Sequence, residues 1–295
     1  MMDVASATAK KTDYKKKLIN LINQTAYSRS KFKVFSDFIE MSAITFSNPL
    51  DFVHREEREA RYLSIINSYD KKHQHSFPLM LFYLTEALEE KTSTSGPEDV
   101  LGVIFHELNL HNERKGQFFT PQAISDMMAM MICGDDKQKA IEEKGFIHVC
   151  EPTVGSGVML TSFCKAMQKE GLNYCTQLVV TAIDCDISCV HMAYLQLSLY
   201  GVPAVVIHGN TITGEEWSRW YTPVYLMNNW IWRASCGICN KYYEEDEKIK
   251  FALEPSYAFF RQIFGYPQKT TDSEELPEAF VEKPHEVFEI KQLSF

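Results

Sequence analysis

Residues 146–169 read FIHVCEPTVGSGVMLTSFCKAMQK, and this stretch decides the fold. It starts with a short apolar run, FIHVC, that has the length and composition of a buried strand. Gly155 and Gly157 follow, and the apolar residues of 158–169 then recur at helical spacing. A strand, a glycine turn and an amphipathic helix in this order predict the opening unit of a parallel α/β sheet.

The same alternation continues toward the C-terminus. The segment QLVVTAI (177–183) is rich in β-branched residues and predicts a second strand, and AVVI (204–207) predicts a third. Between them, residues 187–200 have helical periodicity, and Gly201-Val202-Pro203 stops that helix. We therefore expect an α/β fold with a Rossmann-like, doubly wound parallel sheet.

The N-terminal part of the chain has helical periodicity only. Asn48-Pro49 interrupts it, and the loop TSTSGPED (92–99) ends in residues that cap helices well. The expected helices are 12–46, 52–69, 78–91 and one through VLGVIFHELNL (100–110). The pattern predicts a helical region over 1–112, an α/β domain over 113–235 and a C-terminal extension with an acidic tail over 236–295.

Composition limits the function classes. The chain has 295 residues, 45% of them hydrophobic, which is enough for a real core, and 23% are charged. The net charge of −9 argues against DNA binding through the whole surface, although residues 10–33 are basic and acidic residues gather in 244–247 and 272–289. The start lacks the core of a signal peptide, and no apolar run approaches bilayer length, so a cytoplasmic protein without membrane contact is expected.

The eight cysteines are scattered among apolar residues, as expected for reduced and mostly buried side chains. Only Cys236 and Cys239 form a CxxC pair. A structural zinc site needs four ligands, and no second CxxC or HxxxH lies near this pair. A reduced pair is therefore the favoured interpretation, with zinc as the alternative, and no metal site is predicted.

Polar and glycine residues follow each predicted strand, where ligands bind to such a sheet. Gly155 and Gly157 allow a ligand to approach the backbone, and Asp184 can accept from both hydroxyls of a ribose. Asn210 can bind an adenine edge, and Glu151 can meet an ammonium group. Together they suit a nucleoside with an amino-acid tail, while the absence of GxGxxG and of the Walker pattern disfavours NAD and ATP.

Four sequence motifs of this chain resemble those of a known family. GQFFTP (116–121), EPTVGSG (151–157), Asp184 and Asn210 occur in the order found in the S-adenosylmethionine-dependent adenine-N6 DNA methyltransferases. The chain is similar to the modification subunits of type I restriction systems, in a shortened form, over about residues 30–225. The resemblance implies a class I methyltransferase sheet, S-adenosylmethionine as cofactor, and DNA as substrate, reached directly or through a partner subunit in a homodimer or hetero-oligomer. The implied cofactor-binding residues are Gln117, Phe118, Phe119, Thr120, Pro121, Glu151, Pro152, Thr153, Gly155, Ser156, Gly157, Asp184, Cys185 and Asn210.

Each motif also has a purely structural interpretation. Gly155 and Gly157 can form an ordinary turn, Asp184 or Asp186 can cap a helix, and Phe118 and Phe119 can be core residues. Their joint occurrence in one order favours the site.

The family's catalytic motif, Asn/Asp-Pro-Pro-Tyr/Phe, is missing, because no two prolines of this sequence are adjacent. In the family this motif receives a flipped-out adenine, whose amine needs positioned hydrogen-bond acceptors. Thr222-Pro223-Val224-Tyr225 follows Asn210 and is interpreted as its positional equivalent, with Thr222, Pro223 and Tyr225 as candidate catalytic residues. The alternative is that RWYTPVYLMNNWIW (219–232) is an apolar strand and turn without a site role.

Three hypotheses about function therefore stay open. The first is an adenine-N6 DNA methyltransferase of reduced form, and the second is a protein that keeps the cofactor pocket without catalysis and serves as a regulatory, antirestriction or partner-binding subunit. The third is a methyltransferase acting on something other than DNA. Residues 257–264 are expected to be a short helix, and the acidic tail after them is expected to be a solvated segment, or alternatively one that mimics DNA or docks a basic partner.

Overall fold

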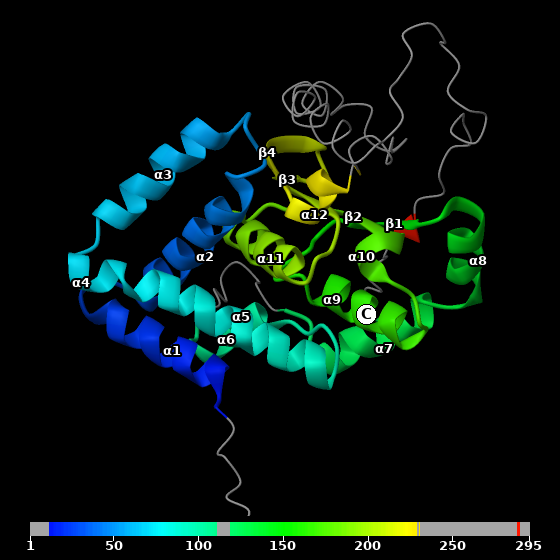
Figure 1. Cartoon of the computed structure of the whole chain (residues 1–295), viewed down its shortest axis with the longest axis horizontal. Coiled ribbons are helices and arrows are strands. Elements are labelled where there is room, and N and C mark those ends of the chain that lie inside the picture. Colours follow the sequence, from blue (N-terminus) through cyan, green and yellow to red (C-terminus); the bar gives the residue numbers. More distant parts are fainter. Residues whose placement is uncertain (1–11, 111–118, 229, 231–287, 290–295) are drawn as a thin grey trace, which may run out of the picture.

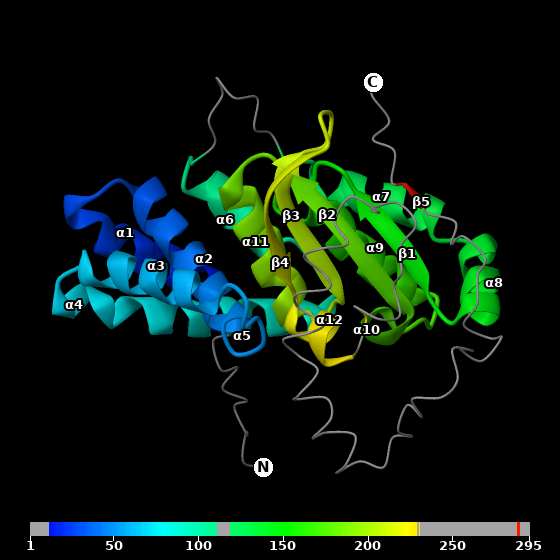
Figure 2. The same cartoon turned by 90° about the horizontal axis from the view of Figure 1, so that it is seen from above.

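The computed structural model describes residues 12–110, 119–228, 230 and 288–289, and it divides into a helical region and an α/β sheet (Figure 1). In Figure 2 the helices α1–α5 lie beside the β4 edge of the sheet, and α8 lies beyond its β1 edge. The N-terminal helices are α1 (Tyr14–Thr25), a 3-10 turn η1 (Ala26–Ser28), α2 (Lys31–Ser47), α3 (Arg55–Asn67), α4 (Lys71–Gln74), α5 (Ser76–Thr94) and α6 (Val100–Glu107). The rest is α7 (Gln122–Ile132), α8 (Asp135–Lys144), β1 (Ile147–Glu151), α9 (Val158–Lys169), α10 (Tyr174–Gln177), β2 (Leu178–Asp184), α11 (Ile187–Leu199), β3 (Ala204–Asn210), β4 (Glu215–Tyr221), α12 (Pro223–Met227) and β5 (Phe288–Glu289).

Local capping explains where the helices begin. Asp13 accepts from the Lys16 N–H at the start of α1, and Ser30 accepts from the Lys33 N–H at the start of α2. The expected single helix over 12–46 is therefore wrong in one respect, because the Ser30 cap starts a second helix after η1. The other predicted helices of this region are confirmed within a few residues.

The sheet has the order β4-β3-β2-β1-β5. β1, β2 and β3 run parallel, with Val149 beside Val180 and Ala182 beside Val206. The two residues of β5 pair in parallel with β1. The three predicted strands are confirmed, and so are the predicted helices α9 and α11. These two helices are the crossover connections that parallel strands require.

One face of the sheet carries the main core. Val180, Ala182 and Val206 belong to the same apolar cluster as α9 and α11, whereas Val205 and Ile207 belong to a smaller cluster on the other face with Tyr225 of α12. Among the described residues both crossover helices therefore cover the same face of the sheet. The predicted α/β class is confirmed. A doubly wound sheet carries crossover helices on both faces, and the described residues show those on one face.

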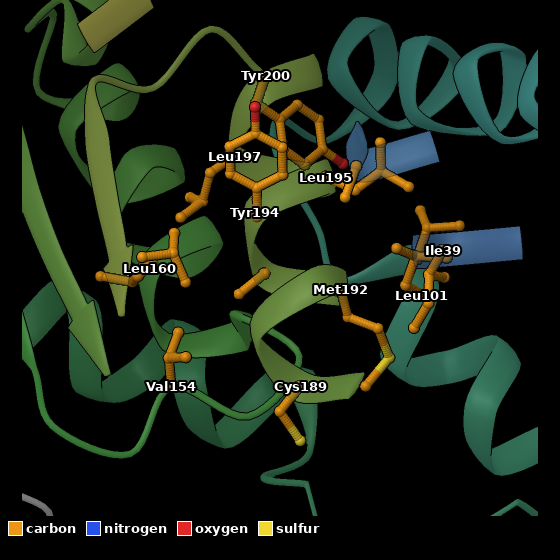
Figure 3. Close-up of a cluster of buried hydrophobic side chains, with 14 of the residues drawn as sticks. Ile39, Leu101, Val154, Leu160, Cys189, Met192, Tyr194, Leu195, Leu197 and Tyr200 are labelled. Atoms are coloured by element: carbon orange, nitrogen blue, oxygen red, sulfur yellow. The ribbon is translucent and has the colours of Figure 1, made fainter. Parts of the chain in front are cut away.

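Helix α11 joins the helical region to the sheet. It is buried on nearly every side, as expected of a helix that is apolar all round. In Figure 3, Met192 of α11 lies next to Leu101 of α6 and Ile39 of α2, while Leu160 of α9 and Val154 lie toward the sheet. A single core cluster extends from Leu18 of α1 through these residues to the strands.

β4 returns antiparallel to β3 through a tight turn at Gly214 (φ 68°). Its last three residues, 219–221, fit the strand-and-turn alternative for 219–232, but the sequence did not predict where β4 begins or which way it runs. Arg58 of α3 fastens this strand. Its guanidinium donates to Asp51 at 2.5 Å and to the Arg219 carbonyl at 2.6 Å, and lies 4.0 Å from the centroid of the Trp220 ring. The helical region thus holds the outermost strand of the sheet.

Replacement of Arg58 by Leu should lower the free energy of unfolding by up to about 3–5 kcal/mol, because the buried Asp51 carboxylate loses the guanidinium and keeps the His54 imidazole as its neighbour. Arg61 lies on the exposed side of α3 and pairs with Glu40 of α2. Its replacement by Leu should lower the free energy of unfolding by about 0–1 kcal/mol. Urea denaturation of both variants checks this, and equal losses would contradict it.

Candidate functional site

The parallel register brings three predicted site residues to one edge of the sheet. Glu151, Asp184 and Asn210 are the last residues of β1, β2 and β3. Glu151 is in register with Ala182, and Asp184 is in register with His208, so each strand ends two residues beyond its neighbour. A carboxyl, a second carboxyl and an amide therefore line the carboxyl edge, where open α/β sheets bind ligands.

The loop from Pro152 to Gly157, called the glycine loop below, is tied to β2. The Val154 N–H donates to the Ile183 carbonyl at 2.9 Å, and the Gly155 N–H donates to the Asp184 carboxylate at 2.9 Å. Gly155 (φ 55°) and Gly157 (φ 99°) adopt left-handed conformations that favour glycine. A Cβ atom on Gly155 would lie 3.2 Å from the Phe119 ring, so a side chain here would also require the ring to shift by a few tenths of an ångström.

Glu151 is the most unusual polar group of the edge. It is 1% exposed, and its Oε1 accepts from the Thr153 N–H at 3.2 Å. Within the described part of the chain its Oε2 has no hydrogen-bond partner. Burial raises the pKa of this carboxyl to about 7, and the nearby Asp184 adds to the rise. A buried carboxyl with one unsatisfied oxygen is suited to a cationic hydrogen-bond donor.

Asp184 and Asn210 are partly occupied by local bonds. Asp184 accepts from the N–H groups of Gly155 and Asp186, and burial raises the pKa of its carboxyl. Asp186, two residues on, caps α11 by accepting from the Ser188 N–H, so the cap interpretation applies to Asp186. Asn210 accepts through Oδ1 from the Ile212 N–H at 3.0 Å and therefore shapes the β3–β4 turn.

The remaining predicted cofactor-binding residues are exposed or half-buried, or lie outside the described residues. Thr153 and Cys185 are exposed, and the Pro152 carbonyl accepts from the Thr211 hydroxyl at 2.5 Å. Pro121 is exposed at the start of α7, and Thr120 is half-buried. Gln117 and Phe118 lie outside the described residues, as do Cys236, Cys239 and the helix expected over 257–264. Of the acidic tail, the structure describes Phe288–Glu289, which form β5.

Phe119, the second aromatic residue of GQFFTP, connects the helical region with the glycine loop. Its ring centroid lies 5.3 Å from those of Phe105 and His106 on α6, and its edge faces Gly155. The core interpretation holds for part of this side chain, which is half-buried against the main apolar cluster.

The structure does not bring Thr222, Pro223 and Tyr225 to this edge. β4 runs antiparallel, so it carries the chain from the Asn210 end back to the opposite end of the sheet (Figure 2). Thr222 is fully buried there, donates to the Val202 carbonyl at 2.8 Å and accepts from the Ala204 N–H at 2.9 Å. Its hydroxyl therefore connects β4 to the start of β3, and the interpretation of this motif as the catalytic equivalent does not fit its position.

One functional contact was missed from the sequence. Ser156 is fully buried, and its hydroxyl donates to Asp99, the N-cap of α6. The sequence of the loop before α6 predicts a helix N-cap. No sequence pattern predicts that the capping carboxylate, Asp99, also accepts from Ser156 in the glycine loop.

A sequence profile of the family described as N-6 DNA Methylase matches residues 98–264, more than half of the chain. The chain belongs to the N-6 DNA methylase family. The match begins at Glu98, beside the Asp99 cap, and includes GQFFTP, the glycine loop and β1–β4. Family membership confirms the resemblance found in the motifs.

Two solved structures are similar at low identity. One, from Listeria monocytogenes, is described as a class I S-adenosylmethionine-dependent methyltransferase, with 14% identity, a TM-score of 0.40, and coverage of 68% of this chain and 55% of that one. The other is the methyltransferase subunit of a type I restriction-modification system from Streptococcus thermophilus, with 14% identity, a TM-score of 0.34, and coverage of 70% and 59%. This chain thus spans somewhat over half the length of each. Comparison with curated proteins finds no match.

No helix in the described part of the chain is both long enough and apolar enough to cross a bilayer.

The raised pKa of Glu151 predicts a pH-dependent stability. Because the folded state holds this proton more tightly than the unfolded state, the group's contribution is most favourable below pH 4.5 and is lost as pH rises toward 7, by up to about 3 kcal/mol. Replacement of Glu151 by Gln removes this loss, so the variant should gain stability over the wild type between pH 5 and about pH 8. Urea denaturation at both pH values measures the difference, and an unchanged difference between the two proteins would show that Glu151 titrates normally.

Proposed function

We propose that this chain binds S-adenosylmethionine at the carboxyl edge of its sheet, and that the chemistry of its family is not carried out by Thr222–Tyr225. The observation that carries the proposal is the buried Oε2 of Glu151, which lacks a hydrogen-bond partner in the described residues and lies one strand away from Asp184. When bound, S-adenosylmethionine supplies an activated methyl group on a sulfonium.

The residues fit such a ligand by their chemistry. Glu151 suits the ammonium of the methionine part, because a buried carboxylate gains most from a cationic donor. Asp184 keeps lone pairs beyond the two that accept backbone N–H groups, and these can accept from ribose hydroxyls. Gly155 lacks a Cβ, so the Phe119 ring packs close to its backbone, and Asn210 keeps its amide N–H₂ for an adenine edge. Gln117, Phe118, Phe119, Thr120, Pro121, Pro152, Thr153, Ser156, Gly157 and Cys185 complete the proposed cofactor set.

The partner proposed from family membership is DNA. On this reading the chain serves as a cofactor-binding subunit that regulates or antagonises a restriction-modification system, alone or with a partner. The placement of the buried Thr222 hydroxyl at the opposite end of the sheet supports it. In the described residues no Asn or Asp followed by two prolines stands at the carboxyl edge.

A second candidate is an active adenine-N6 DNA methyltransferase. The family profile favours it, because the match continues to residue 264, well beyond the last described residue of α12. This candidate requires acceptors for the adenine amine from somewhere other than Thr222.

Calorimetric titration with S-adenosylmethionine should give a dissociation constant in the micromolar range, weakened at least about tenfold in Asp184→Ala, because the ribose loses its acceptor. A matched control is Asp37→Asn, which alters a buried carboxylate in the helical region that accepts from Tyr69. Failure of the wild type to bind millimolar ligand would refute the proposal.

The affinity should also rise with pH. The carboxylate form of Glu151 binds the ammonium, so binding should strengthen as pH rises through about 7 and should become flat in Glu151→Gln. The affinity should be measured at about pH 5.5–7.5, below the range in which the ligand's own α-amino group titrates.

Transfer of labelled methyl groups to DNA separates the two candidates. A cofactor-binding subunit shows saturable binding and no label in DNA, whereas an enzyme shows label that Asp184→Ala removes. In either case Thr222→Val should leave any turnover per folded molecule unchanged. A loss of turnover in this variant without a loss of folding would return Thr222 to the catalytic site.

A further inference from the structure

We propose that helix α6 of the N-terminal region positions the glycine loop, with Asp99 and Gly102 acting as positioning residues through Ser156. The proposal concerns the geometry of the ligand-free loop, and it rests on the proposed function only for its consequence, which is a change in S-adenosylmethionine affinity.

Asp99 is the centre of the arrangement. It is 5% exposed, and its two carboxylate oxygens accept from three donors on three segments of the chain. Oδ1 accepts from the Gly102 N–H at 2.7 Å and from the Gln196 amide at 2.9 Å, and Oδ2 accepts from the Ser156 hydroxyl. Burial of a carboxylate is costly unless such donors satisfy it, so the loss of any one of the three should loosen the arrangement.

Gln196 of α11 holds the other side of Ser156. Its amide N–H₂ donates to the Ser156 carbonyl at 2.8 Å as well as to Asp99. Its Oε1 accepts from the first two N–H groups of α6, those of Val100 and Leu101, at 2.8 and 3.0 Å. Ser156 is therefore fixed through both its side chain and its carbonyl, between two glycines in left-handed conformations.

Gly102 makes this approach possible. Glycine in a helix normally costs stability relative to alanine, so its presence in the first turn of α6 requires a reason. A Cβ atom at this position would lie 2.6 Å from the Ser156 hydroxyl oxygen and 2.0 Å from Asp99 Oδ2. The helix must lack a side chain here for the loop to reach the cap.

The other end of α6 supports the loop from a second direction. Phe105 and His106 contact the Phe119 ring, which in turn faces Gly155. Two turns of one helix thus contact the loop at Ser156 directly and at Gly155 through an aromatic ring. We infer that the helical region is a structural part of the binding edge rather than a separate module beside it.

Hydrogen exchange of the ligand-free protein tests the positioning role. The amides of Val154, Gly155 and Gly157 are hydrogen-bonded and report on the loop. Gly102→Ala should speed their exchange at least about tenfold, although the same change stabilises an ordinary helix. Asp99→Ala should have a larger effect, and Asp99→Asn, which keeps the shape and one acceptor, should restore part of the protection.

Tyr69→Phe is the matched control, because it removes a buried hydrogen bond to Asp37 elsewhere in the helical region. It should lower global stability without a selective change at the loop amides. The inference is overturned if Gly102→Ala and Asp99→Asn, both folded, leave loop exchange at the wild-type rate or change it only in proportion to global stability.

Titration with S-adenosylmethionine then tests the consequence. Gly102→Ala should weaken binding at least about tenfold, and Tyr69→Phe should not change it. A wild type that does not bind would refute the proposed function, while the exchange data would still decide the positioning role. Faster loop exchange with unchanged affinity would overturn the proposed link between α6 and the ligand.

Discussion

The parallel backbone ladder of β1, β2 and β3 is the constraint on which the rest of the structure depends. Parallel strands cannot be joined by a short turn, so each is followed by a crossover helix, and their carboxyl ends must meet at one edge. That requirement places Glu151, Asp184 and Asn210 together although they lie far apart in the sequence. It also requires the tight turn after β1, which Gly155 and Gly157 supply.

The helical region contacts this edge of the sheet through polar as well as apolar side chains. Its core is continuous with that of the sheet through α11, and α6 lies against the glycine loop. Burial of Asp99 makes the contact specific, because only a few arrangements supply three donors to one carboxylate. The stretch matched by the N-6 DNA methylase family, residues 98–264, includes both α6 and the glycine loop.

Periodicity and turn chemistry were sufficient to predict the parallel strands, their helices and the glycine loop. Each is encoded locally: β-branched residues in 178–184, apolar spacing in 187–199, and glycines between them. The start of α2 was missed because the Ser30 cap interrupts a pattern that otherwise continues. The position of Thr222 was beyond sequence reasoning, since strand direction depends on the tight β3–β4 turn and on pairing between distant residues. The Asp99–Ser156 contact likewise joins residues that no local pattern connects.

Sheets of this kind have open edges, and an unpaired edge strand can recruit a strand from another molecule. Among the residues that the structure describes, β4 forms the edge beyond β3, and its Arg219 carbonyl accepts from the Arg58 guanidinium. Trp220 beside it is covered by the same cation. A bulky charged side chain thus occupies the position that an incoming strand would need. Arg58 therefore occupies a backbone acceptor with which an added strand would pair along β4.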